Sequence, residues 1–242
     1  MVLHNKPGFQ VSRVPATEEG ARTIWDIEMA AQNDSNEKNK SSIGDLLWPA
    51  HLKPKKVKTE TEAPSRASDG QDDDIRRMVP MLADPKNTYL LITEETTNKA
   101  VAFSWWAHAK GQTVAQWAEG YKNRYRPPTM NGALMDATGG VRYLKRAGVL
   151  GEKEFMHLKE LYVLPSHQRQ GLGGLMVAFG VDEADERGLP AYTEASPEGL
   201  GLYLKHGFKE VDRVTVDLEQ WGGPKGDFNT YGLLYREAGS VH

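Results

Sequence analysis

The stretch Leu161-Tyr-Val-Leu-Pro-Ser-His-Gln-Arg-Gln-Gly-Leu-Gly173 decides the fold of this chain. Its apolar first part is typical of a buried strand, and Pro165 and a polar turn with two spaced glycines follow it. A helical pattern begins directly after the turn. A strand that enters a helix through such a turn directs several backbone N–H groups to one point, with the positive end of the helix dipole behind them. The sequence therefore predicts a binding site for a phosphorylated ligand.

Two other kinds of phosphate-binding turn fit this stretch less well. A Walker-type loop requires a Lys-Ser or Lys-Thr pair after its glycines, and this sequence has neither pair after Gly173. A dinucleotide-binding turn requires a third spaced glycine, and Gly171, Gly173 and Gly174 do not give that spacing. A nucleotide-dependent enzyme is thus the weaker alternative. A glycine-rich corner without a ligand also remains open for this turn taken alone.

The composition limits the class of protein. A chain of 242 residues suits one sizeable core with an insertion better than two full domains. The net charge of −3 and the pI near 6.2 argue against a general nucleic-acid binder. The chain contains no cysteine, which excludes disulfides, thiol nucleophiles and Cys-ligated zinc. No stretch approaches about 20 apolar residues, so we expect a cytoplasmic protein without a membrane partner.

The first half of the chain predicts strands and helices around a polar interruption. The expected elements are a strand at 9–14, a helix capped by Thr17, a helix from Asp72 to Leu82, and strands at 89–93 and 100–107. Residues 32–74 are rich in Asn, Ser, Lys, Glu and Asp, and predict a polar, flexible loop with a short turn near 43–48. The basic run Lys53–Lys58 fits a solvated linker better than a nuclear address.

The second half contains an insertion and a clearer alternation. Residues 110–150 show two short helical patterns, separated by the breaker Arg126-Pro127-Pro128-Thr129, and we expect this helical insert to pack on the main body. The expected elements after it are a strand at 155–164, a helix at 171–187, a strand at 191–195, a helix between Ser196 and Gly207, and strands at 208–218 and 231–236. This alternation predicts an α/β layer fold with a mixed sheet, and residues 1–242 as a single domain.

Two motifs resemble a known family. The turn Gln168-Arg-Gln-Gly-Leu-Gly173 resembles the Gln/Arg-x-x-Gly-x-Gly/Ala signature of the GNAT superfamily of N-acetyltransferases, and Leu202-Tyr-Leu-Lys-His-Gly-Phe208 resembles its Leu-Tyr-x-x-x-Gly-Phe motif. The motifs span 155–208, and the first half matches only in its order of elements. The resemblance implies a GNAT-type mixed, mostly antiparallel central sheet flanked by helices, with the helical insert before the signature strand.

The resemblance also implies acetyl-CoA as co-substrate, without a metal. The backbone at Leu161 and Val163 would hold the pantetheine arm, and the turn would hold the pyrophosphate. The backbone N–H of Val163 would bind the thioester oxygen. Ser196 stands where many relatives carry Asn. The residues that the resemblance implies for this ligand are Leu161, Tyr162, Val163, Gln168, Arg169, Gln170, Gly171, Leu172, Gly173, Gly174 and Ser196.

The resemblance assigns catalysis to a tyrosine and a general base. Tyr203 would protonate the departing thiolate, although a core aromatic is the alternative for this residue taken alone. His157, Glu160 and Glu194 are the candidate bases, and the sequence does not rank them firmly. His157 has a side chain whose ordinary pKa suits the task. Strict alternation places Glu160 on the face opposite Lys159, and the bulge of GNAT strands changes such directions.

The acceptor is the least specified part. Residues 32–85 and 105–150 would build its site, where Trp105, Trp106, Trp117, Tyr121 and Tyr125 form either an aromatic pocket or a core. We expect an N-acetyltransferase that acts on the primary amine of a small molecule, as a monomer or homodimer and without a nucleic-acid partner. The alternatives are an N-terminal or lysine acetyltransferase of proteins, and an acetyl-CoA-binding sensor or scaffold without turnover.

Overall fold

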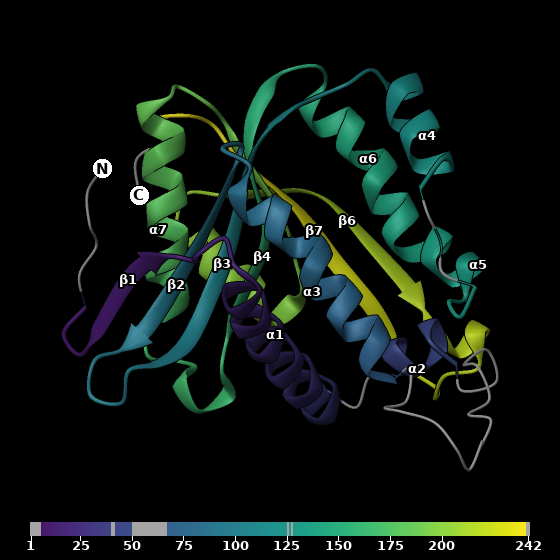
Figure 1. Ribbon diagram of the computed structural model, residues 1–242. Coiled ribbons are helices and arrows are strands. Elements are labelled where there is room, and N and C mark those ends of the chain that lie inside the picture. The colour runs from purple at the N-terminus through teal and green to yellow at the C-terminus, as the bar shows by residue number, and fades with distance from the viewer. Residues whose placement is uncertain (1–5, 40–41, 50–66, 125, 127, 241–242) are drawn as a thin grey trace, which may run out of the picture. The chain divides into compact units, whose positions relative to one another are not determined.

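A computed structural model describes residues 6–39, 42–49, 67–124, 126 and 128–240 (Figure 1). Seven strands form one sheet in the order β1-β2-β3-β4-β5-β7-β6. The strands are β1 Phe9–Arg13, β2 Asn87–Glu94, β3 Lys99–Lys110, β4 Glu154–Val163, β5 Ala191–Ala195, β6 Lys209–Asp217 and β7 Phe228–Arg236. The pairs β1–β2, β2–β3, β5–β7 and β6–β7 are antiparallel, whereas β4 and β5 are parallel. The predicted mixed, mostly antiparallel sheet flanked by helices is confirmed.

Helices occupy most of the connections between strands. The α-helices are α1 Glu18–Asn39, α2 Ile43–Leu47, α3 Ala67–Ala83, α4 Val114–Lys122, α5 Gly132–Met135, α6 Val141–Leu150, α7 Leu172–Glu186 and α8 Pro197–Leu204. Three short elements of other types are the π-helix Asp136–Gly140 and the 3₁₀-helices Pro165–His167 and Leu218–Trp221. Among the described residues, no helix is both long enough and apolar enough to cross a bilayer.

The predicted polar loop at 32–74 is wrong at both of its ends. Helix α1 continues to Asn39 and α3 begins at Ala67, whereas the sequence predicted a helix only from Asp72. Once the apolar stripe of Ile24, Ile27 and Ala31 has fixed the first turns of α1, each further residue adds a hydrogen bond at little entropic cost. The basic run at 53–58 lies outside the described residues.

The chain divides into two compact units. Unit 1 comprises Met1–Asp34, Lys55–Ala107 and Lys159–Phe179, and unit 2 comprises Ser35–Pro54, His108–Leu158 and Gly180–His242. Each unit is described separately below.

The core of unit 1 lies between strands β1–β3 and the helices α1 and α7. Ile24 and Ile27 of α1 and Leu172 and Met176 of α7 are buried against residues of β2 and β3. The fully buried indole of Trp106 in β3 donates a hydrogen bond to the Met176 carbonyl at 3.3 Å. This contact fastens the first turns of α7, which follow the glycine turn, to the sheet.

The core of unit 2 lies around β5, β6 and β7. Leu150, Phe155, Tyr192 and Leu233 are buried there, and the helical insert packs on the unit through α6. In the insert, α5, the π-helix and α6 follow one another without a break from residue 132 to residue 150. The sequence predicted only 141–147 as helical, because Gly139 and Gly140 are weak helix formers.

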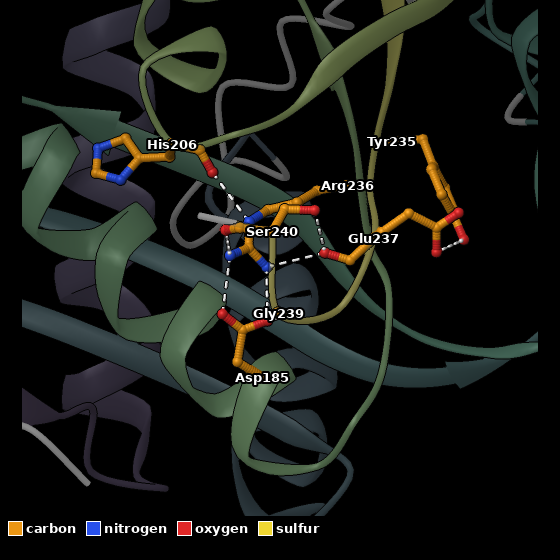
Figure 2. Close-up of polar contacts among 7 residues, drawn as sticks. All are labelled: Asp185, His206, Tyr235, Arg236, Glu237, Gly239 and Ser240. Carbon is orange, nitrogen blue, oxygen red and sulfur yellow. Dashed lines mark hydrogen bonds and ion pairs between the residues drawn. The ribbon is translucent and has the colours of Figure 1, made fainter. Parts of the chain in front are cut away.

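A buried arginine ties the C-terminal end of unit 2 together (Figure 2). The Arg236 guanidinium is 1 % exposed and forms a bidentate ion pair with Asp185 of α7, at 2.7 and 2.8 Å. Its Nε donates to the His206 carbonyl at 3.0 Å, and Nη2 donates to the Ser240 carbonyl at 2.7 Å. These bonds hold the turn that follows Tyr203 in place.

Candidate active site

The glycine turn between β4 and α7 has the backbone of an anion-binding loop. Arg169 and Gly171 both have positive φ, at 62° and 82°. A left-handed conformation costs a residue with a Cβ about 1–2 kcal/mol, so only Gly171 adopts it without strain. Backbone strain of the kind seen at Arg169 is concentrated at functional sites. Alternation of right- and left-handed residues turns successive N–H groups toward one concave point.

The start of α7 supplies further donors. The N–H of Leu175 donates to the Gly171 carbonyl at 3.1 Å, which makes Gly171 the residue that precedes the first turn of the helix. The N–H groups of Leu172, Gly173 and Gly174 therefore have no carbonyl one turn earlier within α7. Gly171 has no side chain with which to cap them, and a Cβ at this position would meet nothing within 4 Å. The donors and the space fit a phosphate or diphosphate.

The strand before the turn is fixed by hydrogen bonds within unit 1. The N–H of Leu164 donates to the Val101 carbonyl at 2.8 Å, and the side chain of Gln168 donates to the Val163 carbonyl at 3.2 Å. The predicted ligand-binding residues Leu161, Tyr162 and Val163 are partly buried against the core. The turn and the end of β4 are thus held at defined positions.

Glu160 has the electrostatic properties of a general base near neutral pH. Burial raises the pKa of Glu160 from 4.5 to about 7; the negative charge of Glu28 raises this pKa further, and the positive charge of Lys159 lowers it. Among the residues described in unit 1, no hydrogen-bond donor contributes to this shift. The carboxylate is therefore both basic and available to receive a proton.

An aromatic pair of unit 1 interacts with Lys159, and one of its members senses the charge of Glu160. Tyr89 stacks on Trp105 with the ring centroids 5.1 Å apart, and the Lys159 ammonium lies 4.3 Å from the centre of the Trp105 ring. Burial raises the pKa of Tyr89, and so does the charge of Glu160. Lys159 itself is exposed, whereas Glu160 is partly buried.

In unit 2, Tyr203 is a buried phenol on α8. Its side chain is 8 % exposed and meets Phe208 edge-on, with the ring centroids 6.0 Å apart. Burial raises the pKa of Tyr203 to about 12; a hydrogen bond with Thr193 lowers this pKa, and the charge of Tyr231 raises it. The Thr193 hydroxyl also donates to the Leu158 carbonyl at 3.0 Å, so it links α8 to β4. Tyr203 is therefore held in its protonated, neutral form.

The other two predicted bases also lie in unit 2. His157 is 7 % exposed, and its ring lies 5.9 Å from Phe155 and 5.4 Å from Tyr192, measured between centroids. Glu194 accepts hydrogen bonds from Arg146 at 2.6 Å and from the Tyr192 hydroxyl at 3.0 Å. Arg142 adds a second ion pair with Glu194 at 3.6 Å. His157 is thus packed among aromatic rings, and the Glu194 carboxylate is held by two cations.

Ser196 occupies the predicted position at the start of α8. Its carbonyl accepts the N–H of Leu200 at 3.0 Å, but its hydroxyl makes no capping hydrogen bond within the described chain.

The aromatic residues expected near the acceptor belong to two separate clusters. Trp105 and Trp106 lie in unit 1, where Trp106 is a core residue. Trp117 and Tyr121 lie in unit 2 and pack on Tyr143, at centroid distances of 4.9 and 5.5 Å. Tyr125, the fifth member of the predicted set, lies outside the described residues.

Glu28 and Gln32 of α1 lie near the site but are not among the residues predicted for it from the sequence. The Gln32 amide donates to Glu28 Oε1 at 2.8 Å and to the Tyr162 hydroxyl at 3.0 Å. A signal was present in the sequence, because Glu28 lies four residues after Ile24, within the apolar stripe of α1. A carboxylate at a core-facing position is uncommon unless it has a partner or a function.

Comparisons with known proteins give a family match for one segment and similar folds for nearly the whole chain. Residues 133–210 match the acetyltransferase (GNAT) domain family. A mosquito arylalkylamine N-acetyltransferase like 5b has 12% sequence identity and a TM-score of 0.57, over 95% of this chain and 99% of its own. The Drosophila melanogaster polyamine N-acetyltransferase has 13% identity and a TM-score of 0.53, over 95% and 99% of the two chains. A Corynebacterium glutamicum protein named as a histone acetyltransferase and related acetyltransferase has 12% identity and a TM-score of 0.53, over 97% and 98%.

At these identities the structural matches establish the fold, and the family match covers the segment with the glycine turn and Tyr203. The chain therefore contains a segment similar to the acetyltransferase (GNAT) domain family and has a fold similar to that of N-acetyltransferases.

Proposed function

We propose that this protein transfers the acetyl group of acetyl-CoA to the primary amine of a small molecule. The observation that carries the proposal is the combination, within unit 1, of a strained turn at Arg169 and Gly171 that suits an anion with a basic, partly buried Glu160. The turn offers donors for a diphosphate, and Glu160 offers a proton acceptor at neutral pH. These are the two protein groups that acetyl transfer to an ammonium ion requires.

The residues around the turn are assigned to acetyl-CoA, which supplies an acetyl group activated as a thioester. The backbone N–H groups from Gln170 to Gly174 bind the pyrophosphate, with Arg169 as an added positive charge. The backbone at Leu161, Tyr162 and Val163 binds the pantetheine arm, and the N–H of Val163 stabilises the negative charge that develops on the thioester oxygen.

Glu160 is the base that we favour among the three candidates. Its pKa of about 7 leaves it about half deprotonated at pH 7, so it accepts a proton readily. Glu194 is less suited, because ion pairs with Arg142 and Arg146, at 3.6 and 2.6 Å, already occupy its carboxylate. His157 is enclosed by Phe155 and Tyr192, which leaves a bulky ammonium little access.

The proposed reaction balances with two protein groups. Glu160 removes a proton from the acceptor ammonium, and the resulting amine attacks the thioester carbon. Tyr203 donates its phenolic proton to the sulfur as the carbon–sulfur bond breaks. Because the pKa of Tyr203 is about 12, a free phenolate is unfavourable, so Tyr203 regains a proton from the new amide nitrogen. The products are an acetamide and a thiol, and Glu160 releases its proton to water.

A small-molecule amine is the acceptor that we favour. The mosquito and Drosophila structures named above are described as arylalkylamine and polyamine acetyltransferases, which supports an amine acceptor. The Corynebacterium protein is named as a histone acetyltransferase, so a lysine or N-terminal amine of a protein is the second candidate.

An amine panel with thiol detection tests the proposal. Arylalkylamines, polyamines, lysine peptides and peptides with free N-termini are each incubated with acetyl-CoA and the protein. We expect thiol release with at least one small amine, and a loss of about 10²–10⁴-fold in kcat for Glu160→Gln. Tyr203→Phe should lower kcat with little change in the affinity for CoA. Tight CoA binding without transfer to any amine would instead indicate a sensor or scaffold.

A further inference from the structure

A group of polar residues connects α1 to the base of the proposed reaction. Glu28 and Gln32 lie one turn apart on α1, and Gln32 bridges the Glu28 carboxylate and the Tyr162 hydroxyl with bonds of 2.8 and 3.0 Å. Tyr162 lies two residues after Glu160 in β4, and its ring packs on Phe103 at 5.6 Å. The face of α1 that carries Glu28 therefore docks on the part of β4 that carries Glu160.

The two carboxyl groups are close enough to influence each other. The charge of Glu28 raises the pKa of Glu160, and burial raises the pKa of Glu28 itself, which the hydrogen bond from Gln32 partly offsets. Such a pair holds fewer than two negative charges at neutral pH unless a cation joins it.

The surroundings offer only partial compensation for this negative charge. Within the described part of the chain, the charged and titratable groups coupled to Glu160 are Glu28 from α1, Tyr89 from β2 and Lys159 from β4 itself. The ammonium of Lys159 lies over the Trp105 ring, 4.3 Å from its centre, and makes a cation–π interaction with this ring. Tyr89, whose pKa the charge of Glu160 raises, stacks on the same Trp105 ring. Carboxylates next to aromatic rings form a suitable site for an organic ammonium ion.

We propose that Glu28 is a specificity-determining residue: with Glu160 it forms a paired-carboxylate subsite that binds the acceptor as an alkylammonium ion. The inference rests on the proposed function, and deepens it by naming a cationic amine as the acceptor class. Gln32 and Tyr162 hold Glu28 toward Glu160. When the ammonium is bound, its charge stabilises both carboxylates, and Glu160 then takes one of its protons while Glu28 remains ionised.

Glu28→Gln tests the role of Glu28, because it removes the charge and keeps the shape. For an alkylamine acceptor we expect KM to rise about tenfold or more, with a smaller change in kcat. The acidic limb of the kcat/KM profile should move to lower pH by about one unit, because the loss of a nearby negative charge lowers the pKa of Glu160. For an arylamine, which is uncharged at neutral pH, KM should stay the same.

Glu18→Gln is the matched control, since Glu18 is an exposed glutamate on the same helix. We expect this variant to keep the wild-type KM and pH profile. An unchanged KM and an unmoved limb in Glu28→Gln would overturn the inference, and so would equal losses for the alkylamine and the arylamine.

A second measurement does not depend on turnover. Carbon-13 NMR of labelled glutamate, assigned with Glu160→Gln, follows the titration of Glu160 in the wild type, Glu28→Gln and Glu18→Gln. Calorimetry with butylamine measures the binding of an ammonium ion directly. We expect a lower Glu160 pKa and about tenfold weaker butylamine binding only in Glu28→Gln. If these results appear but no amine is acetylated, the proposed function fails and the ammonium subsite stands; if they do not appear, the subsite is disproved even where transfer occurs.

Discussion

Glu160 is a single residue whose raised pKa affects both the proposed reaction and the stability of the folded protein. The burial that makes its carboxyl basic also makes its ionisation unfavourable in the folded protein. A hydrogen-bond donor would relieve this cost, but it would also lower the pKa below the range that suits a base. The same residue therefore limits stability and supports the proposed chemistry.

The pH dependence of unfolding follows from this shift. The pKa of Glu160 rises from 4.5 to about 7 on folding, so the folded state binds more protons between these values and loses stability as the pH rises. We expect Glu160→Gln to be more stable than the wild type by about 3 kcal/mol at pH 8, with little difference at pH 4. Urea unfolding of both proteins at several pH values measures this. Parallel stability curves across this range would contradict the shift.

At the scale of elements, the helical insert depends on a close approach between α4 and the π-helix. A Cβ at Gly140 would lie 2.5 Å from the Tyr121 hydroxyl and 2.7 Å from its Cζ. The Tyr121 hydroxyl cannot easily move away, because it donates to Asp136 at 2.6 Å. A glycine is thus required at position 140 for the Tyr121 ring to pack this closely, although glycine is unfavourable in an isolated helix.

Two glycine substitutions in this continuous helical segment should have opposite effects. Gly140→Ala should destabilise the protein by about 1–3 kcal/mol through overpacking against Tyr121. Gly148→Ala should stabilise it by about 0.5–1 kcal/mol, since a Cβ there meets nothing within 4 Å and alanine favours the helix. Thermal unfolding of both variants compares them. An equal gain in both would show that Tyr121 does not pack closely on Gly140.

The hydrogen bonds and the ion pair of Arg236 also connect several elements: they link α7, the residues after α8 and the C-terminal residues (Figure 2). Arg236→Leu leaves Asp185 without its bidentate partner and removes the donor to the His206 carbonyl. We expect a loss of about 3–5 kcal/mol in the free energy of unfolding, measured with urea. Arg213→Leu, which removes an exposed ion pair with Glu210, should change this free energy far less. Similar values for the two variants would count against a structural role of Arg236.

For the molecule as a whole, local patterns predicted more of the fold than of the site. Alternation, caps and the glycine turn predicted the strands and most helices, because these signals lie within a few neighbouring residues. The extent of α1 was missed, since its last turns are polar and depend on helix propagation.

The electrostatics of the site could not be read from the sequence. Gln32 and Tyr162 meet although 130 residues separate them, and the charge of Glu28 acts on Glu160 across a similar separation in sequence. His157 was attractive because of the ordinary pKa of histidine, but its aromatic surroundings come from the pairing of β4 with β5. Whether a side chain acts as a base depends on burial and on neighbours, and both are set by tertiary structure.

The measurement that tests the central proposal most directly is calorimetric titration of the unmodified protein with coenzyme A and, separately, with pantetheine, which lacks the pyrophosphate. We predict that coenzyme A binds and that pantetheine binds at least about a hundredfold more weakly, because pantetheine offers no phosphate to the donors of the turn and of the first residues of α7. Equal affinities for the two ligands, or no binding of coenzyme A, would contradict it.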